Sequence, residues 1–137
     1  MMTRFQKIAL GVAGITSFGI GTFILGAPHA FYASYGIDLG QDPSLLSELR
    51  APGAGLAILG AVMLAGIVRR SLSQVAFFAA LVVFLGFPVG RIVGLVFDGI
   101  PSAAILAALG FELAIAGLCL LAFRSGRESA GMRISLR

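Results

Sequence analysis

Arg91 and Glu112 are the residues whose type and position most suggest chemistry, because each is the lone charge within a long apolar stretch. A charge at the middle of a bilayer costs at least about 2.5 to 3.5 kcal/mol, so such side chains usually face the interior of a helix bundle and find partners. Helical side chains lean toward the N-terminus of their own helix, so those of two antiparallel helices joined by a short turn at residues 98–102 lean toward each other. The sequence therefore predicts an ion pair between Arg91 and Glu112.

Three more charged residues, Glu48, Arg50 and Asp98, belong to the same end of the expected bundle. Glu48 and Arg50 are two positions apart and cannot share a helical face. We therefore expect Arg50 to point inward, toward Glu112 or Asp98. The five groups comprise three acids and two bases, and together they would form a nearly neutral buried polar network.

Two interpretations of this network remain open. It is either a polar clamp that fixes the order of the helices, or the polar floor of an outward-facing ligand pocket capped by the interfacial residues His29, Tyr32 and Tyr35. Ionisable residues inside a membrane are functional candidates by default, which favours the pocket. Complete pairing of their charges would favour the clamp. An adjacent arginine holds a carboxylate in its charged form, which argues against a proton carrier.

Little else in the sequence points to chemistry. One His and one Cys cannot build a zinc or haem site, and no nucleophile has a base at a recognisable spacing. We therefore predict no catalytic residues, no metal and no cofactor; these absences favour a protein that is not an enzyme and leave that question open. The net charge of +4 would elsewhere suggest nucleic acid, but the apolar composition leaves no surface for that partner.

The elements that would position these residues are four apolar stretches in one 137-residue domain, in which 58% of residues are hydrophobic and 12% are charged. A soluble domain has about 25% charged residues, and a spanning helix needs about 20 apolar residues. The predicted fold is an all-α integral membrane four-helix bundle, with the lipid bilayer as its main partner. Its spans are expected at residues 8–25, 51–68, 72–97 and 103–123, with an outer cap segment at 26–50 and a cytoplasmic tail at 124–137.

The distribution of cations predicts the orientation. The cations on one side of the expected bundle are Arg4, Lys7, Arg69, Arg70, Arg124, Arg127, Arg133 and Arg137. The opposite loops contain Asp38, Asp42, Glu48 and Asp98, with Arg50 as their only cation. The positive-inside rule therefore places both termini in the cytoplasm. Arg4 and Lys7 before an apolar run also suit a cleaved secretory signal, but the run is long for a signal, and we expect a retained span.

Turn and packing signals add detail. Pro28 is expected to open a short helix that Gly36 ends, and Asp42 is expected to cap a helix over 44–50. Small residues at four-residue spacing should let neighbouring backbones approach within the chain. These sets are Ala13, Ser17 and Gly21; Gly53, Ala57, Ala61 and Ala65; and Gly86, Gly90 and Gly94.

Three motifs resemble a bacterial family of small four-helix membrane proteins that is classed as a domain of unknown function. They are SELRAPGAG at 47–55, GRIVGLVFDGIPS at 90–102, and Glu112. The family looks related to DoxX-like membrane proteins, some of which are subunits of quinone-linked oxidoreductases. The resemblance implies a multi-pass protein of the bacterial inner membrane and supplies no activity; carrying over the oxidoreductase role would be analogy only.

Three function classes follow. The first is a non-enzymatic accessory subunit or scaffold within a larger membrane complex or a homo-oligomer. The second is a binder of a lipid, a quinone or another apolar small molecule, which requires a cavity beside Arg91 and leaves room for catalysis on that molecule. A transporter ranks last, since the chain shows no recognisable repeat.

Overall fold

The computed structural model describes residues 2–135 of the chain, and the side chains of residues 2–124. All regular elements of this part are helices, and it contains no strand. Its elements are α1 (Arg4–Gly26), α2 (Pro28–Ala33), α3 (Pro43–Val68), the 3-10 helix η1 (Arg70–Leu72), α4 (Ser73–Phe97) and α5 (Ala103–Ser135). Four segments are long and apolar enough to cross a membrane: Arg4–Gly26, Pro43–Val68, Arg70–Phe97 and Ala103–Arg124.

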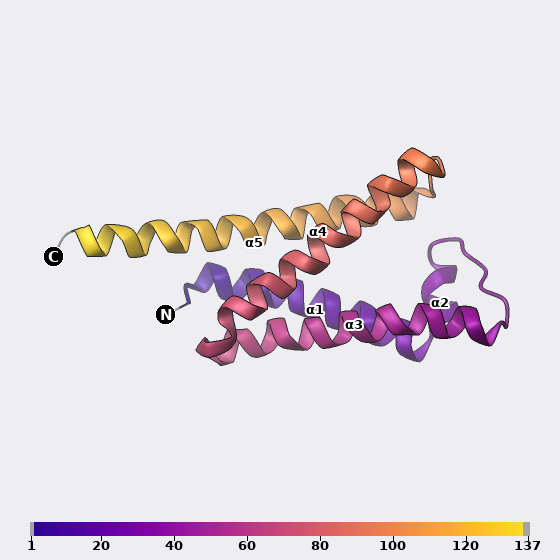
Figure 1. Cartoon of the computed structure of the whole chain (residues 1–137), viewed down its shortest axis with the longest axis horizontal. Coiled ribbons are helices and arrows are strands. Elements are labelled where there is room, and N and C mark those ends of the chain that lie inside the picture. The colour runs from indigo at the N-terminus through magenta and orange to yellow at the C-terminus, as the bar shows by residue number, and fades with distance from the viewer. Residues whose placement is uncertain (1, 136–137) are drawn as a thin grey trace.

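Figure 1 shows how the long helices are arranged. Helices α1 and α3 run side by side, and theirs is the most extensive contact between helices in the described part of the chain. Helix α4 starts at the end of α3 and crosses obliquely to reach α5. We call the end that contains α2, the start of α3 and the turn at 98–102 the cap end. The cations Arg69 and Arg70 lie at the opposite end, between α3 and α4.

The predicted caps of the helices at the cap end are confirmed. Pro28 occupies the first turn of α2, and Gly36 adopts a positive φ of 77° shortly after that helix ends. The side chain of Asp42 accepts a hydrogen bond of 2.8 Å from the backbone N–H of Ser44 at the start of α3. These local signals act within a few residues, so the rest of the fold does not override them.

The boundary expected near residue 50 is wrong, because α3 is one helix from Pro43 to Val68 and includes Pro52. Proline in a helix removes one hydrogen bond, here the bond to the carbonyl of Glu48. Both Glu48 and Pro52 are exposed, so the freed carbonyl does not lie in a dry interior. The segment 26–50 is therefore a short helix and a loop, followed by the first two turns of α3.

Small residues bring the backbones of α1 and α3 together, as their spacing predicts. A Cβ atom added to Gly21 would lie 2.3 Å from the Ala57 nitrogen, and one added to Gly60 would lie 2.4 Å from the Phe18 nitrogen. Ser17 is 1% exposed and donates a 2.8 Å hydrogen bond to the Leu56 carbonyl. The contact face of α3 contains Gly53, Ala57 and Gly60, whereas Ala61, expected on that face, is exposed.

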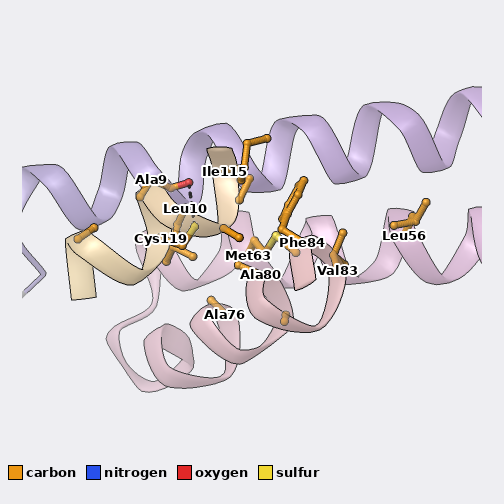
Figure 2. Packing of buried hydrophobic residues seen from close by; sticks show 14 of the residues in the cluster. Ala9, Leu10, Leu56, Met63, Ala76, Ala80, Val83, Phe84, Ile115 and Cys119 are labelled. Atoms are coloured by element: carbon orange, nitrogen blue, oxygen red, sulfur yellow. Dashed lines mark hydrogen bonds between the residues drawn. The ribbon is translucent and has the colours of Figure 1, made fainter. Parts of the chain in front are cut away.

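The apolar core lies toward the end opposite the cap. Figure 2 shows Leu10 of α1, Met63 of α3, Phe84 of α4 and Cys119 of α5 packed together, and these side chains are at most 2% exposed. Within the hairpin formed by residues 85–114, Pro88 is the one buried residue. The cap-end halves of α4 and α5 are therefore packed far less tightly than their other halves, and Figure 1 shows them diverging from α1 and α3.

The prediction that Gly86, Gly90 and Gly94 admit a neighbouring backbone is wrong. A Cβ atom added to Gly86 or Gly90 would have no neighbour within 4 Å, and one on Gly94 would meet only the side chain of Asp98, at 3.6 Å. All three glycines lie in the 85–114 hairpin, where α4 has separated from α3. They therefore leave space instead of closing an interface.

Candidate ligand cavity

A cavity of about 850 Å³ lies between the cap-end half of the α4–α5 hairpin and the helices α1 and α2. This volume falls within the range of about 300 to 1,000 Å³ that is usual for small-molecule sites. Its walls are mainly apolar and come from α1, α3, α4, α5 and residues 28–37, which we call the α2 segment. The polar side chains that line it are Thr16, Ser17, Tyr32, Tyr35, Arg91 and Glu112.

The ion pair predicted between Arg91 and Glu112 is present in the cavity wall. Arg91 Nε donates to Glu112 Oε2 and Arg91 Nη2 donates to Glu112 Oε1, both at 2.9 Å. The exposed fractions of the two side chains are 25% for Arg91 and 13% for Glu112. The carboxylate therefore faces one edge of the guanidinium and leaves another edge accessible.

Arg50 does not turn toward Glu112 or Asp98, so this prediction is wrong. It is exposed, and its Nη1 donates to the backbone carbonyl of Leu25. The last carbonyl groups of a helix have no partner within that helix, and the C-terminal end of the helix dipole attracts cations. Arg50 thus joins the start of α3 to the C-terminal end of α1.

Glu48 and Asp98 also lie apart from the pair, so the five-residue network is wrong as predicted. Both are exposed, and neither forms an ion pair with any side chain that the structure describes. Asp98 ends α4, where its backbone N–H bonds to the Gly94 carbonyl. Arg91 and Asp98 are seven residues apart on α4 and so lie on nearly the same helical face. Asp98, however, lies more than one turn beyond the cavity wall, where solvent competes for its charge.

The α2 segment closes the cap end of the cavity with aromatic rings. Phe31 contacts Tyr32 edge-on, with ring centroids 5.2 Å apart, and contacts Tyr35 at 5.3 Å. Burial raises the pKa of the Tyr32 phenol; the positive charge of Arg91 opposes this rise and Tyr35 adds to it. Both tyrosines line the cavity together with Arg91.

A hydrogen bond ties this aromatic cap to the α4–α5 turn. Ser102 Oγ donates to the Tyr35 carbonyl at 3.2 Å. His29, which the sequence groups with the tyrosines, does not line the cavity: its Nε2 lies 2.7 Å from the Gly40 carbonyl and so helps to hold the loop after α2. The aromatic cap of the cavity thus consists of Phe31, Tyr32 and Tyr35.

Several lining residues were not identified from the sequence as cavity residues. Ser17 fits a packing face by its spacing, and Phe87, Ile105 and Phe111 are apolar residues in apolar spans. Gly86 and Gly90 were assigned to a helix contact but line the cavity instead. Their four-residue spacing marked a glycine face correctly, although nothing in the local sequence says whether such a face meets a helix or a cavity.

Among the described residues, no group of three His, Cys, Asp or Glu side chains could hold a metal ion. The α5 helix continues to Ser135, through the segment expected as a cytoplasmic tail. Three cations that enter the predicted orientation lie outside the described part: the side chains of Arg127 and Arg133, and the whole of Arg137.

Comparison with known proteins identifies a family for the chain. The family model described as a domain of unknown function (DUF4345) matches residues 5–123, which include every residue that lines the cavity. No curated protein and no solved structure shows significant similarity to the chain. The function must therefore be inferred from the cavity itself.

Proposed function

The chain belongs to the DUF4345 family, which is described only as a domain of unknown function, and we propose that the protein binds an apolar small molecule, of lipid or quinone type, in this cavity. The observation that supports this proposal most is the position of the Arg91–Glu112 pair in the wall of a mainly apolar cavity of about 850 Å³. Apolar walls with a few convergent polar groups are typical of small-molecule sites.

The cavity supports binding over a purely structural clamp. A clamp accounts for the ion pair between α4 and α5, but it does not require space beside that pair. Here Gly86 and Gly90 keep the wall of α4 open, since an added Cβ at either position would have no neighbour within 4 Å. Glycine lowers helix stability by up to about 1 kcal/mol relative to alanine. A wider cavity would account for glycine at these two positions.

The ligand would reach the site from a membrane. Four helices are long and apolar enough to span one, and large apolar side chains are exposed along them, among them Ile15, Ile58 and Val82, each more than 60% exposed. We place the chain in a bacterial inner membrane, with both termini in the cytoplasm, in line with the distribution of cations. The relationship to DoxX-like proteins belongs to the same proposal and rests on the motif resemblance.

Photolabelling with a long-chain alkyl diazirine tests the proposed binding. The protein is reconstituted in phosphatidylcholine nanodiscs, irradiated with the probe, and mapped by peptide mass spectrometry. We expect labels on the cavity residues Phe87, Ile105 and Ala108. Labelling confined to outward side chains such as Ile58 and Val96 would refute the proposal.

Two glycine variants provide a matched comparison. Gly90→Leu places a side chain in the cavity wall, whereas Gly110→Leu places one in open space on α5, outside the cavity lining. Both changes improve helix propensity by a similar amount. Gly90→Leu should reduce cavity labelling several-fold while Gly110→Leu leaves it unchanged. Equal labelling in both variants would mean that the probe does not enter the cavity.

An accessory subunit or scaffold is the second candidate, and the thin packing of the 85–114 hairpin favours it. With Pro88 as its one buried residue, this hairpin leaves room for a helix of another chain, from a larger complex or a second copy. Purification in a mild detergent after cross-linking tests this candidate. A stable, stoichiometric protein partner that Gly90→Leu displaces, without any bound small molecule, would favour the accessory role over ligand binding.

A further inference from the structure

The Arg91 guanidinium has donors that Glu112 does not use. A guanidinium carries five N–H groups; Glu112 accepts from Nε and from one N–H of Nη2. The two N–H groups of Nη1 and the second N–H of Nη2 remain. None of these three bonds to any group that the structure describes, although Arg91 lines the cavity and is 25% exposed. These donors are accessible from the cavity and not buried, so they can bind a ligand that accepts hydrogen bonds.

The charge at this point of the cavity is already balanced. Arg91 and Glu112 are the charged side chains among the lining residues, and they neutralise each other. An anionic head group at Arg91 would leave a net negative charge close to the Glu112 carboxylate. A cationic head group would leave a net positive charge close to Arg91. Both arrangements are costly in an apolar surrounding, where charges are weakly screened.

The other polar groups at the site are neutral. The side chains of Tyr32 and Tyr35 line the cavity together with Arg91. Each phenol carries an O–H group that can donate to an acceptor in the cavity. The remaining walls, which include Phe87, Ile105 and Phe111, would surround an apolar body.

We infer that the ligand of this cavity is an uncharged apolar molecule with a carbonyl oxygen, which accepts hydrogen bonds from the free edge of Arg91 beneath Tyr32 and Tyr35. This inference rests on the proposed function and makes it specific. It assigns the ion pair a recognition role: Glu112 cancels the charge of Arg91 and leaves its donors. Ketones, esters and related carbonyl compounds fit the site, whereas fatty acids, phosphates and amines do not.

Competition between matched probes tests the inference on the intact protein. Methyl laurate, laurate, dodecylamine and dodecane share a twelve-carbon chain and differ at the head group. Each competes with the alkyl diazirine for labelling of Phe87, Ile105 and Ala108, at a pH where laurate is ionised and the amine is protonated. One additional hydrogen bond to a charged donor corresponds to about a tenfold gain in affinity. Methyl laurate should therefore compete at about one tenth of the concentration that any of the other three requires.

The outcomes separate the inference from the proposed function. Competition by laurate, dodecylamine or dodecane at the same concentration as methyl laurate, or lower, would overturn the carbonyl assignment and leave the proposed cavity in place. Failure of all four probes would overturn both. The double variant Arg91→Met with Glu112→Leu should still bind dodecane but lose the preference for methyl laurate. A preference that survives in this variant would show that Arg91 does not recognise the head group.

Discussion

Gly21 of α1 lies directly against the backbone of Ala57 in α3: a Cβ atom added to Gly21 would come within 2.3 Å of the Ala57 nitrogen and 2.9 Å of its Cα. Both neighbours are backbone atoms, so no side-chain rotation can make room. Helices associate this closely in membranes when small residues occupy the contact. The α1–α3 pair is thus the most closely packed helix pair among the described residues, and the α4–α5 hairpin lies beside it.

Gly21→Ala should destabilise the protein by about 1 to 3 kcal/mol, because the added methyl group forces the two helices apart. Gly19→Ala is the control on the same helix, since its Cβ would have no neighbour within 4 Å. That change should be neutral or stabilise the protein by up to about 1 kcal/mol through helix propensity. Thermal unfolding in detergent measures both variants. Equal stability of the two would contradict the close approach of α1 and α3.

The Arg91–Glu112 pair should behave as a coupled unit. Glu112→Gln leaves the guanidinium without its carboxylate, and Arg91→Met leaves the carboxylate without its partner. Each should cost about 3 kcal/mol, the lower end of the range for broken buried pairs, because both side chains are partly exposed. The double variant Arg91→Met with Glu112→Leu should recover much of this loss.

A thermodynamic cycle of the two single variants and the double variant measures the coupling. Coupling of more than about 1 kcal/mol is expected for groups in direct contact. Strictly additive effects, or single variants as stable as the parent, would mean that the ion pair does not hold α4 against α5.

Ser17→Ala should lower the stability by about 0.5 to 1.5 kcal/mol, since it removes a buried hydrogen bond between α1 and α3. Thr22→Val is the comparison, because the Thr22 hydroxyl is exposed and bonds only within its own helix, to the Phe18 and Gly19 carbonyls. Its loss should be smaller. Chemical or thermal unfolding of both variants measures the difference, and a larger loss for Thr22→Val would contradict the assigned role of Ser17.

Tyr32 should make the stability depend on alkaline pH. Burial raises the pKa of its phenol, Arg91 opposes the rise and Tyr35 adds to it. The unfolded chain therefore loses this proton at a lower pH than the folded protein does. The stability that Tyr32 contributes is fully present below its unfolded pKa of about 10 and is lost as pH rises through the folded pKa. Unfolding measured across this range should show a steeper fall for the parent than for Tyr32→Phe; parallel curves would contradict the raised pKa.

The proposed orientation is tested by labelling single cysteines in intact cells, in a Cys119→Ala background. Gln41→Cys lies in the exposed loop at the cap end, and Ser71→Cys lies in the exposed turn at the opposite end. A membrane-impermeant thiol reagent should label residue 41 directly and residue 71 only after permeabilisation. The reverse pattern would place the termini outside.

Local rules were sufficient to predict much of the helical framework. Asp42 and Pro28 mark helix starts, because capping groups and proline act on the adjacent turn. The meeting of Arg91 and Glu112 also follows from the sequence: a five-residue turn at 98–102 forces the two helices to be antiparallel, and the lean of their side chains then brings the charges together.

The tertiary structure alone decided what lies beside that pair. Gly21 and Gly90 are both glycines in small-residue rows, yet one touches a neighbouring backbone and the other lines a cavity. Arg50 and Asp98 have charges that could join the network, but one binds the end of α1 and the other is exposed beyond the cavity wall. Spacing along a helix fixes which residues share a face. How far α4 and α5 diverge from α1 and α3, and so what each face meets, depends on packing between segments distant in the sequence.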